Sequence, residues 1–314
     1  YSIMSDWFFQ MVFVATAASI VSGTVAERVK FWPFFIFVVV LTGFIYPIQG
    51  AWTWGKGWLY VQGFSDFAGS TIVHSVGGWA ALMGAIIIGA RRGKYGPDGS
   101  VHPMPGANLP LATLGTFILW LGWFGFNGGS QLALGSAGDA TAISNVFVNT
   151  NLAAAAGVVA AVAASQAMFG KIDLTMALNG AIGGLVSITA GPDLTFHFYS
   201  VIIGAIGGVL VVITVPMLDK MKIDDVVGAI PAHLVCGIWG TLAVAIFGEG
   251  TFVAQITGII AIGVFVSITS AIVWYVLRAT MGLRPTEEQE ELGLDRAEVG
   301  MEAYPEFGTG SARL

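Results

Sequence analysis

The chain has 314 residues, of which 55% are hydrophobic and only 10% charged, with a net charge of −6 and a mean hydropathy of +0.79. Soluble globular domains carry about 25% charged residues, so this composition excludes a soluble protein and indicates an all-α integral membrane protein. The single cysteine, Cys236, excludes an internal disulfide framework and a cysteine-based metal cluster.

Apolar segments long enough to cross a hydrocarbon core of roughly 30 Å recur along the chain, and helices satisfy the backbone in such segments. We expect one transmembrane domain over residues 1–281 and an acidic tail over residues 282–314. No signal peptide or initiator methionine precedes Tyr1, so we also expect the sequence to be truncated at its N-terminus. The nine expected spans are residues 5–25, 31–50, 66–90, 109–126, 143–169, 174–190, 196–218, 226–247 and 252–277.

The positive charges indicate the orientation in the membrane. Of the 13 Lys and Arg residues, only Lys56 lies in a loop that follows an even-numbered span. Because positively charged loops stay on the cytoplasmic side, we expect the odd-numbered loops and the tail to be cytoplasmic and Tyr1 to lie outside.

Aromatic residues mark the first span and the loop after the second. Phe9 and Phe13 are four residues apart and share one helix face, which suits either a plug in a narrow pore or ordinary core packing. The outer loop contains Trp52, Trp54 and Trp58 among glycines, and interfacial anchoring is the expected role for two of these three. A tryptophan on a glycine-rich turn at a pore mouth could instead hold a small cation against its ring, with about 0.5–2 kcal/mol of stabilisation.

A thirteen-residue pattern begins the third span and recurs at the eighth. Because its first copy follows an outer loop and its second a cytoplasmic loop, the two copies run in opposite directions and form an inverted repeat. The matching residues are Asp66, Gly69, His74, Val76 and Gly78 in the first copy, and Asp225, Gly228, His233, Val235 and Gly237 in the second.

The two histidines are expected to meet near the membrane midplane. Eight residues of helix place each histidine about 12 Å inward from its aspartate, and the copies enter from opposite faces. A lone buried histidine would more simply be a core residue, but His74 and His233 together indicate a pathway. Asp66 has two possible roles. It could serve as a helix cap and nothing more, or it could cap the helix and also provide a negative field that favours cations at the outer mouth.

Glycines and aromatic residues alternate at the end of the fourth span. We expect Phe126 to face Phe13 from another helix and Ser130 to lie at the outer surface near Trp54. In the tail, Leu283 and other leucines are interleaved with charges. This pattern favours docking on the basic cytoplasmic loops, and a disordered acidic tail is the alternative.

Several motifs of the chain are informative together. They are Ala26-Glu27-Arg28, Asp66-Phe67-Ala68-Gly69 with His74, Gly122-Trp123-Phe124-Gly125-Phe126-Asn127, His233 with Cys236-Gly237, and the tail Gly282-Leu283-Arg284 with Glu287-Glu288 and Gly293-Leu294-Asp295. These motifs resemble those of the ammonium transporter family, in the Amt/Mep branch of the Amt/Rh group, over essentially the whole chain. Family members typically have eleven spans, and this chain matches the last nine. Val299 also stands where the family's tail often has a histidine.

The resemblance implies the ammonium-transporter fold, a homotrimer with one narrow hydrophobic pore per subunit, and a location in the cell membrane. It also assigns roles to individual residues. An outer recruitment site for ammonium would comprise Trp54 and Ser130 with Trp123 nearby and Asp66 in support; Phe13 and Phe126, with Phe9 beside them, would form a gate; His74 and His233 would be the twin histidines of the pore.

Ammonium or ammonia is the expected substrate, and the lipid bilayer surrounds the protein. The resemblance also allows a trimeric nitrogen-regulatory partner of the PII type at the cytoplasmic face. We do not expect the protein to be an enzyme. We also expect no resident cofactor or metal and no nucleic-acid partner. Three alternatives remain open: an ammonium sensor that signals through the tail, an Rh-like electroneutral gas channel, and an intramembrane haem protein with histidine axial ligands.

Overall fold

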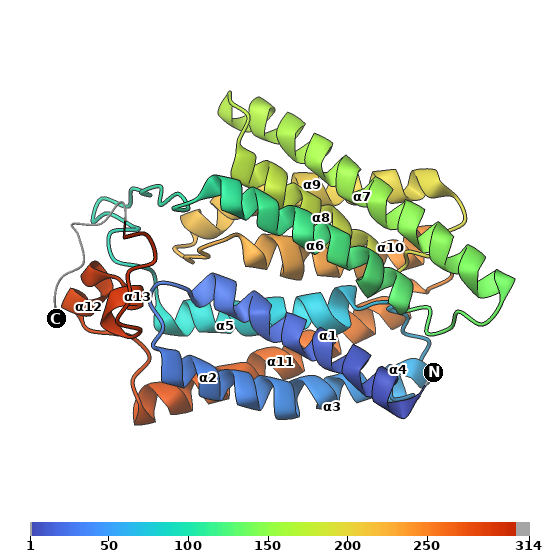
Figure 1. The fold of residues 1–314 in the computed structure, drawn as a ribbon, viewed down its shortest axis with the longest axis horizontal. Helices are drawn as coiled ribbons and strands as arrows, with labels where there is room; N and C mark the ends of the chain where they lie inside the picture. The colour runs from blue at the N-terminus through green and yellow to red at the C-terminus, as the bar shows by residue number, and fades with distance from the viewer. Residues whose placement is uncertain (1, 306–314) are drawn as a thin grey trace.

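The computed structural model describes residues 2–305. Its long helices lie roughly along the longest axis of the molecule in two groups, one built mainly from each half of the chain (Figure 1). The first group contains α1 (Ile3–Val25), α2 (Phe31–Val40), η1 (Leu41–Ile45), α3 (Tyr46–Ala51), α4 (Trp58–Val61), η2 (Ser70–Ser75) and α5 (Val76–Ile88), joined by α11 (Phe252–Thr280). The second contains α6 (Leu109–Gly129), α7 (Ala137–Phe169), α8 (Leu174–Ile188), α9 (His197–Lys220), η3 (Ile230–Val235) and α10 (Cys236–Phe247).

The helix lengths make the chain a multi-pass membrane protein. Within the described residues, 8 helical segments are long and apolar enough to span a membrane. The sixth expected span, residues 174–190, is the exception, because its helix α8 has only 15 residues. At 1.5 Å per residue, α8 is about 22 Å long, so this expected span is present as a short apolar helix that ends two residues before its expected end.

The helices that carry the two repeat copies begin later than expected. The sequence pattern placed the starts at residues 66 and 226, whereas the membrane-spanning helices begin at Ser70 and Ile230. Gly69 has a φ of 107° and Gly228 a φ of 76°, a left-handed conformation that glycine adopts without steric strain. Because non-helical backbone follows each aspartate, the eight-residue helical rise assumed from sequence does not apply.

Both copies then pass through a π-helical turn before continuing as ordinary α-helix. These turns are η2 (Ser70–Ser75) and η3 (Ile230–Val235), and each contains the histidine of its copy. π-Helical turns are rare and frequently occur at functional sites. From the middle of the molecule, α5 extends toward the end that carries the C-terminal helices and α10 toward the opposite end (Figure 1). The inverted repeat expected from sequence is therefore present in the fold.

The last glycine of each copy allows the two copies to cross. A methyl group on Gly78 would lie 2.6 Å from the Cβ of Leu234, which is too close for two carbon atoms. A methyl group on Gly237 would overlap the carbonyl oxygen of Ser70. Each copy thus contacts the backbone of the other through a position where only glycine fits, and this contact fixes how closely the two histidines approach.

Buried charges join the loops at the end of the molecule opposite the N-terminus. The Arg28 side chain donates to Gly89 O at 2.7 Å and to Asp224 O at 2.6 Å, and Arg91 Nε lies 2.9 Å from Asp224 Oδ2. Burial by itself would raise the pKa of Asp224, but the hydrogen bonds from Arg91 and the charges of both arginines outweigh it and hold that pKa below its ordinary value. The carboxylate is therefore ionised and binds Arg91 of the loop before α6, while the Asp224 backbone carbonyl binds Arg28 of the loop before α2.

The tail docks on these same loops, as the leucine and charge pattern predicted. The Leu283 side chain is buried, and its carbonyl accepts from Lys30 N at 2.8 Å. Arg284 pairs with Glu290 at 2.6 Å, and Glu290 also accepts from Arg92 N at 3.1 Å. These contacts place α12 (Glu287–Leu292) and α13 (Leu294–Ala297) against the body (Figure 1). Residues 306–314 of the expected tail lie outside the described residues.

The glycine crossing generates a stability prediction. Replacing Gly237 with Ala forces a methyl group against the Ser70 carbonyl, and overpacking of this kind costs about 1–3 kcal/mol. We expect the thermal unfolding midpoint in detergent to fall. Gly115→Ala is the matched control, because a methyl group at Gly115 in α6 meets no atom within 4 Å. Equal midpoints for the two variants would contradict the crossing argument.

Candidate functional site

The two repeat histidines meet inside the protein. His74 Nδ1 lies 3.1 Å from His233 Nδ1, and the rings are nearly parallel, with centroids 5.2 Å apart and an interplanar angle of 18°. His74 is fully buried and His233 is partly buried. The predicted meeting of the imidazoles is therefore confirmed in position.

The short contact between the two histidines constrains their protons. A hydrogen bond between two imidazole nitrogens needs one donor and one acceptor, so a neutral pair must adopt opposite tautomers. One Nε2 atom is then an acceptor and the other a donor. His74 Nε2 is buried and has no protein partner among the described residues, so it is free to bind a small polar molecule.

A column of aromatic rings leads up to the histidines. Phe13 of α1 and Phe126 of α6 have centroids 4.2 Å apart, and Phe126 lies 5.3 Å from the His74 ring. Trp54 packs edge-on against Phe13 at 5.8 Å. We call Trp54, Phe13, Phe126, His74 and His233 the ring column. It combines residues from separate parts of the sequence in one continuous series of ring contacts.

The Trp54 end of the ring column is held by the segment before η2. Trp54 Nε1 donates to the carbonyl of Asp66 at 3.0 Å. The Asp66 carboxylate is buried and accepts four backbone N–H groups, those of Gly69 and Ser70 on one oxygen and of Thr71 and Ile72 on the other, at 2.8–2.9 Å. Asp66 is therefore the N-terminal cap of η2, the structural role considered from sequence.

The remaining predicted residues lie beside the ring column. The Phe9 ring is 4.7 Å from Phe13 and packs on Gly129, next to Ser130. Ser130 is partly exposed, and its hydroxyl donates to Phe126 O at 2.8 Å. Trp123 stacks on His74 with centroids 5.0 Å apart and an interplanar angle of 13°. Trp123 thus contacts the histidine end of the ring column, whereas Trp54 contacts Phe13 at the opposite end.

Sequence reasoning missed two buried polar residues at the site. The Gln49 side chain donates to the carbonyl of Ile72 in η2 at 3.0 Å, and Thr189 accepts the indole N–H of Trp123 at 2.9 Å. The sequence shows each of them only as a polar residue within or next to an apolar span. Many such residues form their hydrogen bond within their own helix, so this feature alone does not indicate a functional site.

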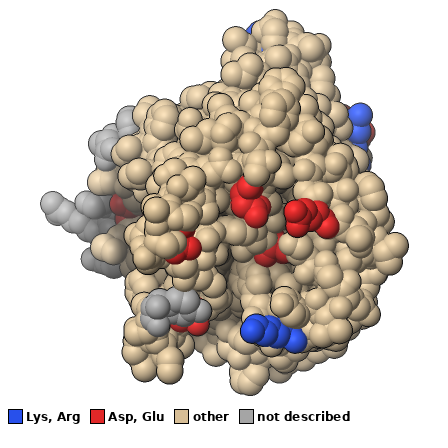
Figure 2. Space-filling model, turned by 90° about the vertical axis from the view of Figure 1, so that its right-hand side faces the viewer, with Lys and Arg blue, Asp and Glu red and all other residues tan. Residues whose placement is uncertain are grey.

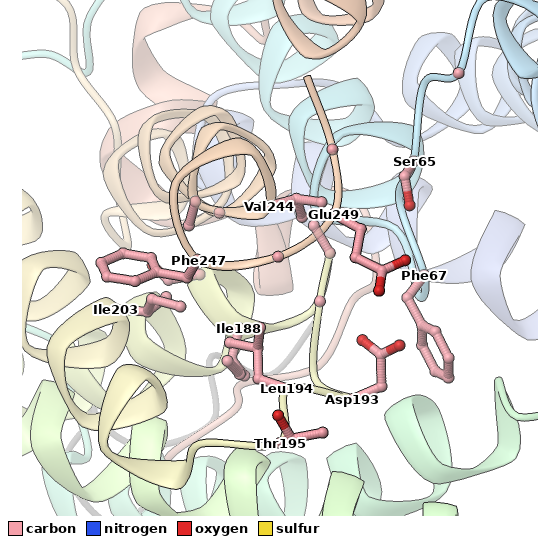
Figure 3. Close-up of a pocket in the computed structure, with 18 residues that line it drawn as sticks. Ser65, Phe67, Ile188, Asp193, Leu194, Thr195, Ile203, Val244, Phe247 and Glu249 are labelled. Atoms are coloured by element: carbon pink, nitrogen blue, oxygen red, sulfur yellow. The ribbon is translucent and has the colours of Figure 1, made fainter. Parts of the chain in front are cut away.

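The face at the N-terminal end carries few basic groups. Figure 2 shows acidic side chains around a hollow on this face. A pocket of about 460 Å³ lies at the ends of α8 and α10, and Asp193 and Glu249 point into it (Figure 3). Burial, and then the charge of Glu249, raises the pKa of Asp193. The residues that line this pocket do not include those of the ring column.

Comparison with known proteins identifies the family. The sequence model of the Ammonium Transporter Family matches residues 1–304. The chain belongs to this family. Ammonium transporter Amt2 of Archaeoglobus fulgidus is 43% identical, over 96% of this chain and 70% of the relative. Ammonium transporter Amt2 of Methanocaldococcus jannaschii is 39% identical, over 96% of this chain and 71% of the relative.

Solved structures of ammonium transporters share the fold. A structure described as a sensor Amt protein superposes with a TM-score of 0.90 at 41% identity, covering 94% of this chain and 76% of that one. Mep2 of Candida albicans superposes with a TM-score of 0.80 at 28% identity, covering 96% and 71%. The protein is thus an all-helical membrane transporter rather than an enzyme, and family membership supports ammonium transport as its activity.

Loss of the Asp66 carboxylate should destabilise the start of η2. Asp66→Ala would leave four buried backbone N–H groups without an acceptor, at about 1–3 kcal/mol for each group that stays unpaired. We expect this variant to yield little folded protein in size-exclusion chromatography, and Asp66→Asn, which keeps one acceptor oxygen, to yield more. Asp139→Ala at the exposed start of α7 is the control, with an expected cost of about 1 kcal/mol. A well-folded Asp66→Ala protein would contradict the capping role.

Proposed function

We propose that the protein transports ammonium across the membrane along the ring column. The ion is held at the outer end by Trp54 and Ser130, with Trp123 further inward, and it is deprotonated as it passes the gate of Phe13 and Phe126. Ammonia then moves along His74 and His233. The observation that carries this proposal is the 3.1 Å contact between the two histidines at the inner end of the aromatic stack.

Chemistry rather than size must select the substrate. Ammonium and potassium ions are similar in size, so a sieve cannot separate them. An ammonium ion can donate hydrogen bonds and lose a proton, and a potassium ion can do neither. The indole face of Trp54 offers cation–π contact at the outer end, whereas the buried Phe13 and the partly buried Phe126 disfavour any species that keeps its charge.

The histidine pair suits the passage of ammonia and a proton. A charged imidazolium would be costly at a position as buried as His74, so neutral rings are favoured. Neutral imidazoles can donate to and accept from ammonia, and their facing Nδ1 atoms let a proton move from one ring to the other. A permanently charged lysine or aspartate at this depth would block or trap the substrate.

Assembly and orientation complete the proposal. The protein forms a homotrimer in the cell membrane, as the family resemblance implies. Its docked tail lies on the cytoplasmic side, as the distribution of Lys and Arg predicts. The cytoplasmic loops and tail are then the surface available to a PII-type regulatory protein.

A sensor role is the second candidate function. The similarity to a structure described as a sensor Amt protein favours it. The tail contacts loops next to α2 and α5, and these elements pack against the membrane helices. As a sensor, the protein would signal to a partner, through the tail, that ammonium occupies the ring column.

Removing His74 tests the transport route. His74→Ala takes away the buried Nε2 and the partner of His233. We expect ammonium-dependent current and uptake in proteoliposomes to fall about tenfold or more, because proton transfer between the rings is lost. His102→Ala, on an exposed loop, serves as the control and should leave transport unchanged. An unchanged, ammonium-selective current in His74→Ala would remove the histidine relay from the mechanism.

Deleting the tail separates transport from sensing. A protein truncated after residue 281 loses the contacts of Leu283, Arg284 and Glu290. If the tail only supports the transporter, ammonium uptake should fall by a few fold together with the unfolding midpoint. Full uptake combined with loss of a downstream nitrogen response would instead support the sensor role. Uptake and nitrogen response are measured in the same cells.

A further inference from the structure

The indole ring of Trp123 stacks on His74. Trp123 is buried, with parallel contact to His74 at 5.0 Å and a tilted contact to Phe126 at 5.5 Å. It therefore touches both the gate and the histidine pair. Stacking alone leaves a ring free to slide or turn in its own plane, whereas a hydrogen bond from the indole N–H fixes it.

Thr189 supplies that hydrogen bond. Its hydroxyl lies at the C-terminal cap of α8 and accepts from Trp123 Nε1 at 2.9 Å. The same hydroxyl is 2.7 Å from Leu185 O and 3.2 Å from Asn127 Oδ1, and it has one proton to donate to either of them. Both hydrogen-bonding capacities of the hydroxyl, as donor and as acceptor, are thus satisfied within the protein.

The bond belongs to a closed buried network. Asn127 lies one turn after Trp123 on α6, and its amide donates to Thr150 Oγ1 of α7 at 3.0 Å. Thr189, Asn127 and Thr150 are all fully buried. Three helices are therefore joined at the indole N–H, and the network holds the edge of the Trp123 ring while His74 stacks on its face.

Thr189 is also joined to the outer end of the site. Its carbonyl accepts from Ala68 N at 3.0 Å, within the segment that follows Asp66. Trp54 donates to Asp66 O in that segment. One residue thus contacts, through its hydroxyl, the indole beside the histidines and, through its backbone, the segment that holds the outer tryptophan.

We propose that Thr189 is a positioning residue for transport: its hydroxyl fixes the Trp123 ring against His74 and so sets the orientation of the first histidine of the pair. The inference rests on the proposed transport function and adds to it a residue that makes no contact with either imidazole among the described interactions. Removing the hydroxyl should misalign the histidine pair while leaving recruitment at Trp54 and Ser130 in place.

The decisive variant is Thr189→Val, which keeps the shape of the side chain and removes the hydroxyl. We expect the maximal rate of ammonium uptake to fall about tenfold, because the buried N–H of Trp123 loses its partner. The ammonium concentration at half-maximal rate should change by less than about threefold. Thr189→Ser should restore the rate to within about twofold of wild type. Ser187→Ala is the matched control, since the Ser187 hydroxyl donates to Gly183 O one helical turn away and has no bond to Trp123 among the described residues.

Trp123→Phe keeps an aromatic ring and removes the N–H. If Thr189 acts through this N–H, the double variant should be no slower than the slower single variant. Independent, multiplicative losses in the double variant would overturn the proposal. If Thr189→Val gives little folded protein, Trp123→Phe alone tests the bond, because it removes the N–H and leaves the contacts among Thr189, Asn127 and Thr150 in place. A wild-type uptake rate in Trp123→Phe would then overturn the proposal.

A spectroscopic measurement separates this inference from the transport proposal. In protein labelled at histidine, the ring current of Trp123 shifts the NMR resonances of the His74 ring. Thr189→Val should move these resonances and leave those of His102 unchanged. Unmoved His74 resonances together with a wild-type rate per folded molecule would show that Thr189 is only structural. A wild-type protein that transports no ammonium would refute the proposed function, and the resonance comparison would still decide the role of Thr189.

Discussion

The contact between two imidazole nitrogens is the constraint on which the rest of the site depends. It exists because two chain segments of opposite direction cross where each has a glycine, and because an aspartate caps the start of each segment. A side chain at Gly78 or Gly237 would push the segments apart, and the histidines would move with them. The aromatic residues of the ring column then only need to fill the space that leads to this contact.

Much of this arrangement could be predicted from sequence. Asp, Gly, His and Gly recur at shared offsets, and the structure gives each recurring type the same task in both copies: cap, left-handed turn, imidazole and crossing point. The π-helical turns and the late helix starts could not be predicted, because hydropathy does not distinguish one helical hydrogen-bonding pattern from another.

The site could be predicted only in part. The spacing of Phe9 and Phe13 indicated a shared face, and the family resemblance paired Phe13 with Phe126, which the 4.2 Å contact confirms in position. The support behind Trp123 was not predictable, because Thr189 is 66 residues away and a threonine at a helix end usually bonds its own backbone. Its partner across the protein becomes visible only when the helices are placed in space.

The opposite tautomers of the histidine pair have a consequence for turnover. Suppose that a proton enters at the accepting Nε2, that the shared proton shifts between the Nδ1 atoms, and that the far ring releases its own. Both rings then carry their hydrogens on the other nitrogen, so the pair is left reversed. A second proton cannot follow in the same direction until the starting arrangement returns. The pair therefore passes one proton in a given direction per cycle, and the speed of this resetting step sets an upper bound on how fast charge can accompany ammonia.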